Sequence, residues 1–262
     1  MGEKTMTVKR GLSRSALKLI AMSTMLIDHI GAVVLYPILV QTAQTGQGWV
    51  QHWSELVDLY TVMRQIGRVA FPIFCFQLVE GFQRTGNKYR YALRLFLFAL
   101  ISEIPFDLAL EGVMLETGYQ NVMFTLFFGL LVMITCDKLE NLERNGKKMN
   151  KWFLLGLEII VVYVGMKAAD FMNTDYAGFG VLCISVLYYF RHNRTWQLIQ
   201  GSVAFIAGEQ ILMGTSSELL APLGFIPVAL YHGDRGARLK YLYYFFYPMH
   251  LIVLYGIRML LM

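Results

Sequence analysis

The segment MLIDHIG, residues 25–31, places an aspartate and a histidine side by side within an apolar run. Ionisable side chains inside a membrane-spanning helix are costly, and they usually face a cavity or a transport pathway. Imidazole titrates near neutral pH and is the commonest general base in proteins. Asp28 and His29 are therefore the first candidates for proton-transfer chemistry in this chain.

Four more ionisable side chains are expected at a similar depth. With a rise of 1.5 Å per residue along each expected helix, the whole set lies about 15 to 21 Å from one membrane face. Its members come from five segments and are Asp28, His29, Arg68, Glu103, Glu209 and His250. One interpretation is a catalytic or transport layer. The alternative is a structural ion-pair network in which Arg68 binds Glu103 or Asp28.

The spacing between Lys18 and His29 adds a possible binding function. Eleven residues are three helical turns, so both side chains project from one helix face about 16 Å apart. This pattern predicts a cavity with Lys18 at a basic mouth, holding the anionic end of a phosphate-bearing donor, and His29 deeper inside. The alternative is that Lys18 only marks the cytoplasmic side of the membrane.

Other polar residues give weaker signals. Arg64 and Arg68 share a helix face, and they either hold an anionic substrate or anchor the outer interface. Arg94, near the inner end of its segment, snorkels, pairs with Glu80 or serves as a second donor-binding residue. The default interpretation of Asn121 and Asp175, at outer helix ends, is capping or solvation. The candidates for substrate binding are Arg64, Asn121 and Glu209.

The composition indicates an integral membrane protein that is all-α. Of the 262 residues, 56% are hydrophobic and 16% are charged, and the mean hydropathy is +0.48; soluble domains carry about 25% charged residues. We predict one domain over residues 1–262, a transmembrane bundle of about nine helices, with eight or ten also compatible. The expected spans are 15–38, 62–83, 90–110, 121–137, 152–167, 176–190, 196–213, 219–231 and 240–261.

The basic residues predict the orientation. If the N-terminus is cytoplasmic, the segments expected on the cytoplasmic side hold all but five of the 23 Lys and Arg residues. The five exceptions are Arg64, Arg68, Arg94, Lys167 and Arg258. This distribution favours a multi-pass protein of a bacterial cytoplasmic membrane over a nucleic-acid-binding protein, which would need a basic soluble face. Three cysteines without metal-ligand spacing, at 75, 136 and 183, predict no metal site.

Five segments of the sequence are similar to the TraX family of integral membrane proteins, named for a conjugation-associated acetyltransferase that modifies pilin. They are LKLIAMSTMLIDHIG at 17–31, MRQIGRVAFPIFCFQLVEGFQRTGNKYRYALRLFLFALISEIPFD at 63–107, NVMFTLFFGLL at 121–131, APLGFIPVALYHGDRG at 221–236 and YFFYPMHLIVLY at 244–255. TraX proteins resemble the wider transmembrane acyltransferases, in which a first-span Arg-x10-His pattern supplies the histidine. Lys18 replaces that arginine here, and His29 matches.

The resemblance implies acetyl-CoA as donor and a pilin-type N-terminus as acceptor, although a sugar or a lipid headgroup fits the sequence equally well. In this hypothesis His29 removes the proton of an acceptor amine or hydroxyl as it attacks the thioester. Glu103 or Glu209 orients the imidazole, since Asp28 diverges from His29 by about 100° on the helix. Arg68 or His250 stabilises the developing oxyanion.

Two other classes of function compete with an acyltransferase. A proton-coupled transporter of a small anionic solute would also use Asp, Glu and His near the midplane. Transporters commonly contain internal repeats and interrupted helices, and we predict neither from this sequence. A non-catalytic membrane scaffold would need no alignment of Lys18 with His29.

Overall fold

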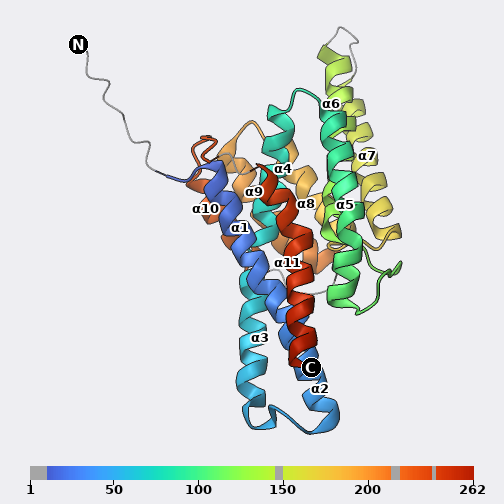
Figure 1. The fold of residues 1–262 in the computed structure, drawn as a ribbon. Helices are drawn as coiled ribbons and strands as arrows, with labels where there is room; N and C mark the ends of the chain where they lie inside the picture. The colour runs from blue at the N-terminus through green and yellow to red at the C-terminus, as the bar shows by residue number, and fades with distance from the viewer. Residues whose placement is uncertain (1–10, 145–149, 214–218, 238–239) are drawn as a thin grey trace, which may run out of the picture.

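The computed structural model describes residues 11–144, 150–213, 219–237 and 240–262, and every regular element in these ranges is a helix. The all-α prediction is therefore confirmed for this part of the chain (Figure 1). The helices are α1 (Arg14–His29), η1 (Ile30–Leu35), α2 (Tyr36–Thr45), η2 (Val50–His52), α3 (Trp53–Gly67), α4 (Ala70–Arg84), α5 (Lys88–Leu110), α6 (Val122–Arg144), α7 (Lys151–Phe171), α8 (Ala177–Tyr189), α9 (Arg194–Met213), η3 (Ala221–Gly224), α10 (Phe225–Ala229) and α11 (Lys240–Leu261).

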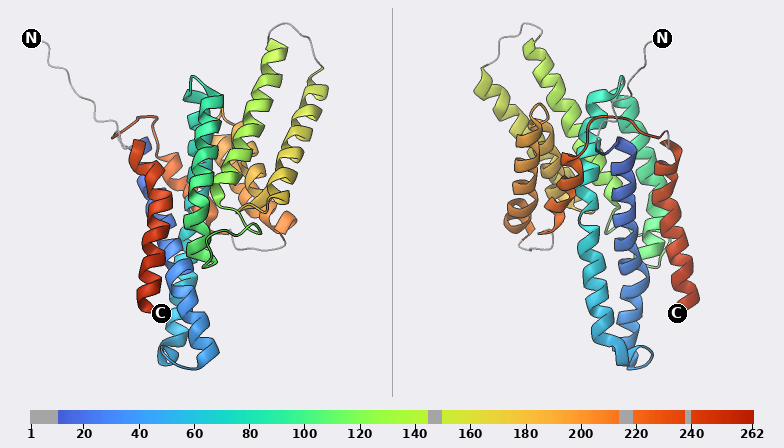
Figure 2. Two further views of the ribbon diagram at one scale, coloured as in Figure 1. Left: turned by 45° about the vertical axis from the view of Figure 1, so that its right-hand side comes forward. Right: turned by 90° about the vertical axis from the view of Figure 1, so that its left-hand side faces the viewer.

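The first two membrane segments are longer than expected and both are interrupted. The first runs from Arg14 to Thr45 through the π-helical turn η1, which follows His29 directly. The second runs from Val50 to Arg84 and breaks between α3 and α4, at Arg68 and Val69. The prediction of uninterrupted spans is therefore wrong. The α2–α3 hairpin projects beyond the other helices in every view (Figure 1, Figure 2).

Helix α4 lies at the centre of the bundle. Almost all of its residues from Ala70 to Phe82 are buried, because its neighbours cover every face of an almost wholly apolar helix. It packs against α1, α6 and α8, while α11 packs against α5 and η1. A second apolar cluster, around Met25, Phe106 and Leu251, joins α1, α5 and α11. These packing contacts hold the C-terminal part of α1 against the middle of α11.

Five helical segments in the described ranges are long and apolar enough to cross a membrane: Arg14–Thr45, Val50–Arg84, Val122–Leu142, Lys151–Phe171 and Tyr244–Leu261. The protein is thus a membrane protein by the length and composition of its helices. The span expected at 219–231 is wrong, since its residues form the short helices η3 and α10. That segment is too short for one crossing because a helix needs about 20 residues.

Basic side chains from segments distant in sequence meet at one end of the molecule, which we call the basic end. Arg14 and Arg84 bind Glu80 there, and Arg194 lies over the Tyr231 ring. All are among the residues expected on one membrane side. Other members of that set lie outside the described residues: Lys4, Lys9, Arg10, Lys147, Lys148 and Arg238.

Candidate functional site

Two histidines from opposite ends of the chain form the centre of the site. His29 ends α1 and His250 lies in α11, and their Nδ1 and Nε2 atoms are 2.6 Å apart. The His250 Nδ1 lies 2.7 Å from the Phe246 carbonyl oxygen. A carbonyl only accepts, so His250 carries its proton on Nδ1 and accepts through Nε2. His29 then donates from Nδ1, and its neutral ring keeps Nε2 unprotonated.

This hydrogen-bonded chain corrects one expectation about the site. The partner of the His29 imidazole is His250, not Glu103 or Glu209. The same bonds occupy both nitrogens of His250, which leaves it no spare donor for an oxyanion. His250 is 6% exposed and stacks on Phe246 with ring centroids 4.7 Å apart. Its ring is therefore fixed, as an orienting group must be.

His29 lines a polar cavity of about 260 Å³, which we call cavity B. Tyrosines and charged side chains surround it: Asp28, Tyr36, Tyr60, Arg64, Arg68, Glu111, Tyr119, Asp175 and Tyr176. Asp28, His29 and Arg68 are thus neighbours, as the depth calculation predicted. Arg64 shares this cavity with Arg68, and its Nη1 donates to the Asp28 carboxylate over 2.7 Å.

A close approach of two helices holds Asp28 in cavity B. A Cβ atom on Gly67 would lie 2.2 Å from the Asp28 Oδ1 atom, so glycine is required at that position. Gly67 ends α3 directly before the break at Arg68. The missing side chain therefore lets α3 approach α1 at the level of the histidine.

The turn between α7 and α8 forms the far wall of cavity B. Tyr176 and Ala177 have positive φ angles of 64° and 42°, which is strained backbone for residues with side chains. Asp175 beside them accepts a 2.7 Å hydrogen bond from the Tyr119 hydroxyl. Burial raises the pKa of Asp175, and this hydrogen bond and the nearby arginines oppose the shift. The sequence suggested a capping or solvated residue at a helix end, whereas Asp175 is half-buried, bound to Tyr119 and part of the wall of cavity B.

A second cavity, of about 200 Å³, lies toward the basic end, and we call it cavity A. Residues from successive turns of one face of α1 line it, from Arg14 and Lys18 to Met22 and Met25. Eleven residues of helix correspond to about 16 Å, so cavity A is elongated. Its other walls are mostly apolar and come from α4, α5, α6 and α11: Phe71, Phe74, Gln77, Leu78, Gly81, Tyr91, Leu95, Val122, Met123, Leu126, Tyr244, Phe246 and Tyr247.

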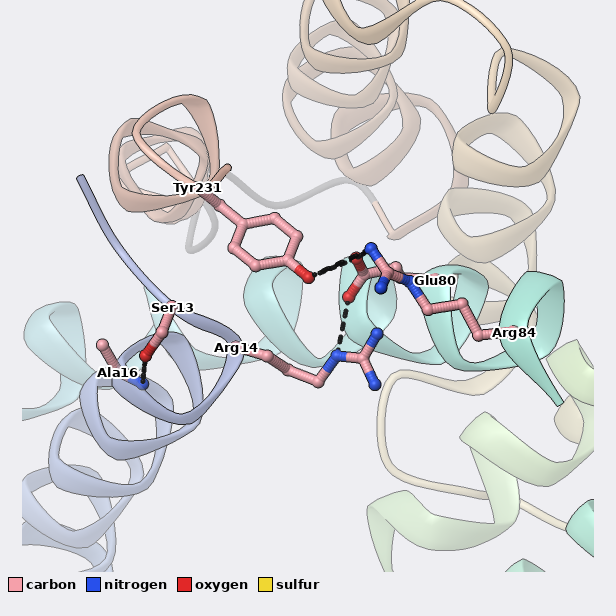
Figure 3. Close-up of polar contacts among 6 residues, drawn as sticks. All are labelled: Ser13, Arg14, Ala16, Glu80, Arg84 and Tyr231. Carbon is pink, nitrogen blue, oxygen red and sulfur yellow. Dashed lines mark hydrogen bonds and ion pairs between the residues drawn. The ribbon is translucent and has the colours of Figure 1, made fainter. Parts of the chain in front are cut away.

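Glu80 organises the polar groups at the mouth of cavity A. Figure 3 shows the guanidinium groups of Arg14 and Arg84 and the Tyr231 hydroxyl converging on its carboxylate. The Arg14 Nε and Arg84 Nη2 distances to Glu80 oxygens are 3.1 and 2.7 Å. Burial and the neighbouring Glu80 raise the pKa of Tyr231, which keeps its phenol protonated. One carboxylate thus positions two cations.

Cavities A and B are separate, and the histidine pair lies at the wall between them. Lys18 lines cavity A whereas His29 lines cavity B, so the single chamber expected from their spacing is wrong. Tyr247 belongs to this wall, because it lines cavity A and its ring centroid lies 6.3 Å from that of His29. Sequence reasoning missed Tyr247, which is one aromatic residue among many in α11.

Five predicted site residues line neither cavity. One is His250, which lies behind His29, and the other four are Glu103, Asn121, Glu209 and Arg94. Glu103 is buried and accepts a hydrogen bond from the side chain of Asn121, while Asn121 also caps the first turn of α6. Glu209 is 1% exposed on α9, a helix that packs against α8. Arg94 is exposed and lies 5.9 Å from the Tyr91 ring centroid. The expected Arg94 pair with Glu80 is wrong, since Glu80 binds Arg14 and Arg84.

Gln77 is a second residue that sequence reasoning missed. It lines cavity A and is 8% exposed. A local signal exists, because Gln77 is the single uncharged polar side chain in the run AFPIFCFQLVEGF, residues 70–82. A polar residue in such a run must face other polar groups or a cavity.

Comparisons with known proteins agree with this description of a membrane protein. The family model described as TraX protein matches residues 13–258. A probable fimbrial assembly protein FimC, serogroup H1, of Dichelobacter nodosus is 31% identical over 226 residues, which are 77% of this chain and 85% of the relative. No solved structure matches the chain.

Proposed function

Because the chain belongs to the TraX family, we propose that it is a membrane-embedded acyltransferase that moves an acetyl group from acetyl-CoA to an amine or hydroxyl acceptor. The observation that carries this proposal is the hydrogen-bonded pair His29 and His250 at the wall between two cavities. A group-transfer enzyme must bring two substrates to one base. Cavity A and cavity B supply one approach each.

Cavity A has the chemistry that an acyl-CoA donor needs. Arg14 and Lys18 lie at its basic mouth, where phosphate groups would bind, and mostly apolar walls lead inward to Tyr247. Lysine binds phosphate as a point charge, whereas arginine offers a planar fork. Because Lys18 stands where related acyltransferases carry an arginine, Arg14 one turn earlier supplies the guanidinium in this proposal. The basic end then faces the cytoplasm of a bacterial cell.

Cavity B would hold the acceptor. Its arginines and carboxylates suit a compact polar group such as a peptide amine end, a sugar or a lipid headgroup. The printed name of the Dichelobacter nodosus relative, a probable fimbrial assembly protein, favours a pilin-type acceptor. His29 Nε2 removes the acceptor's proton, the acceptor attacks the thioester carbon, and the C–S bond breaks. The proton passes from His29 to the departing thiolate, while His250 keeps the imidazole in this tautomer.

The proposal is tested with purified protein, isotope-labelled acetyl-CoA and host membrane extract. His29→Ala should lower label transfer about 10²- to 10⁴-fold while acetyl-CoA still binds. His52→Ala is the matched control, because His52 lies near the tip of the α2–α3 hairpin and contacts Glu55. Unchanged transfer by the His29→Ala protein would contradict the proposal.

A transporter is the second candidate, and the two interrupted helices favour it. η1 and the break at Arg68 lie at the level of the histidine pair, and broken helices surround the substrate in many transporters. Proteoliposomes decide between the two functions. A transporter would move a small anion without acetyl-CoA, whereas an acyltransferase would label acceptors without such flux.

A further inference from the structure

Three buried polar atoms without a hydrogen-bond partner belong to residues that line cavity A. They are Arg14 Nη2, Gln77 Nε2 and the Tyr247 hydroxyl. Buried donors in folded proteins almost always have a partner. Three such donors around one cavity indicate a ligand rich in hydrogen-bond acceptors.

The three donors are arranged from the mouth of cavity A inward. Arg14 lies at the basic end, and its Nε is held by Glu80. Gln77 lies one turn of α4 further in than Glu80. Tyr247 lies at the inner end, where its ring contacts both histidines, with centroids 6.3 Å from His29 and 5.7 Å from His250. An elongated ligand with an anionic head would therefore place its far end at Tyr247.

Tyr247 is the residue best placed to act on that far end. It is 3% exposed, and its hydroxyl donates to no described residue, while the Val122 backbone N–H faces its oxygen. The first residues of α6, Val122 and Met123, line the same cavity. The N-terminus of a 23-residue helix carries a partial positive charge that favours an anion. The two residues first expected to stabilise an oxyanion are less suitable, because His250 is committed and Arg68 lines cavity B.

We infer that Tyr247 is a catalytic residue whose hydroxyl donates a hydrogen bond to the carbonyl oxygen of the acyl thioester bound in cavity A. This inference rests on the proposed acyltransferase function and deepens it. When the acceptor attacks the carbonyl carbon, the negative charge that develops on that oxygen is met by the Tyr247 O–H and the N-terminal end of α6. The Tyr247 hydroxyl keeps its proton throughout. As the C–S bond breaks, the electron pair on the oxygen re-forms the C=O bond and the negative charge leaves on the thiolate, which takes the proton held by His29.

An infrared measurement tests the hydrogen bond without any acceptor. Acetyl-CoA labelled with ¹³C at the carbonyl is added to the full-length protein in detergent, and the isotope-edited carbonyl band is compared with that in solution. We expect a shift to lower frequency in the unmodified protein and in Tyr244→Phe. In Tyr247→Phe the shift should be lost. Tyr244 is the matched control, because it also lines cavity A and stacks on Phe98.

Kinetics supply the second measurement. Tyr247→Phe should lower kcat for label transfer about 10²- to 10³-fold, as loss of one oxyanion donor does, with the KM for acetyl-CoA unchanged. Binding of acetyl-CoA with an unshifted band in the unmodified protein, or a shift that survives in Tyr247→Phe, overturns the role of Tyr247 but leaves the acyltransferase proposal standing. If the unmodified protein binds no acetyl-CoA, the proposed function and this inference both fail.

Discussion

Cavities A and B flank the same histidine pair but differ in shape and chemistry. Cavity A is elongated, mostly apolar and basic at its mouth, and residues on its walls carry unpartnered donors. Cavity B is polar and contains an internal ion pair between Asp28 and Arg64. The two cavities therefore suit different ligands: cavity A suits a long ligand with an anionic head, and cavity B suits a compact polar one. A single channel for one solute would need no such contrast.

The largest expected effect comes from His250, the hydrogen-bond partner of His29 at the wall between the two cavities. His250→Phe removes the acceptor for the His29 Nδ1 proton, so the ring loses its tautomer and orientation. We expect label transfer in single-turnover experiments to fall about 10²-fold. His250→Gln should retain more activity, because its side-chain oxygen can accept the same proton. If both variants were as active as the unmodified protein, His250 would not orient His29 for catalysis.

A change confined to cavity B should affect acceptor binding without affecting acetyl-CoA binding. Gly67→Ala forces a Cβ atom toward the Asp28 carboxylate, and overpacking of this kind costs about 1–3 kcal/mol of the free energy of unfolding. We expect a lower melting temperature and a higher KM for the acceptor, with the Kd of acetyl-CoA unchanged. Gly156→Ala is the control, since an added Cβ there meets nothing within 4 Å. Weaker acetyl-CoA binding in Gly67→Ala would contradict the division into two sides.

A change at the mouth of cavity A should weaken acetyl-CoA binding and leave acceptor binding unchanged. Lys18→Gln should weaken acetyl-CoA binding about 10-fold through loss of one charged contact, and the loss should shrink at high salt. Binding is measured by titration calorimetry in detergent. Arg94→Gln should bind as the unmodified protein does, because Arg94 is exposed and lines neither cavity. An equal loss in both variants would indicate general attraction to a basic surface.

The smallest effect is a pH dependence from cavity B. Since the pKa of Asp175 is raised by burial, the folded protein binds this proton more tightly than the unfolded chain. This contribution to stability is present below the ordinary pKa of 3.8, and it is lost as pH rises through the higher folded-state pKa. In Asp175→Asn the melting temperature should fall less as the pH rises. The difference from the unmodified protein should be a few degrees at most, since 1 kcal/mol shifts Tm by about 2–4 °C. If Asp175→Asn and the unmodified protein had the same Tm at every pH, the pKa of Asp175 would not be raised in the folded protein.

The depth of each site residue in the membrane could be predicted from the sequence, but the helices that it faces at that depth could not. Counting residues placed His29, Asp28, Arg68 and His250 in one layer, and these four lie around one wall or cavity. Glu103 shares the predicted depth and yet binds Asn121. Counting residues gives only the position of a side chain along the membrane normal. It therefore shows which residues share a depth but not which of them are in contact.

The interruptions of the first two long helices were only partly visible in the sequence, through the prolines Pro37 and Pro72 that follow them within one turn. Pro72 has no N–H for the carbonyl of Arg68, four residues earlier, but the residues of η1, IGAVVL, are ordinary for a membrane helix. Their geometry depends on contacts between helices, such as the approach of Gly67 to Asp28. Local propensity is a weak guide where packing decides the backbone.

Membrane helices and a basic end could be predicted without any coordinates, because hydropathy and charge act on each segment independently of its neighbours. Tertiary structure alone decided that His29 meets His250, 221 positions away, and that a wall containing Tyr247 separates Lys18 from His29. Those contacts depend on how the helices pack and rotate against one another. In a bilayer, apolar side chains facing lipid and those facing neighbouring helices look alike in sequence.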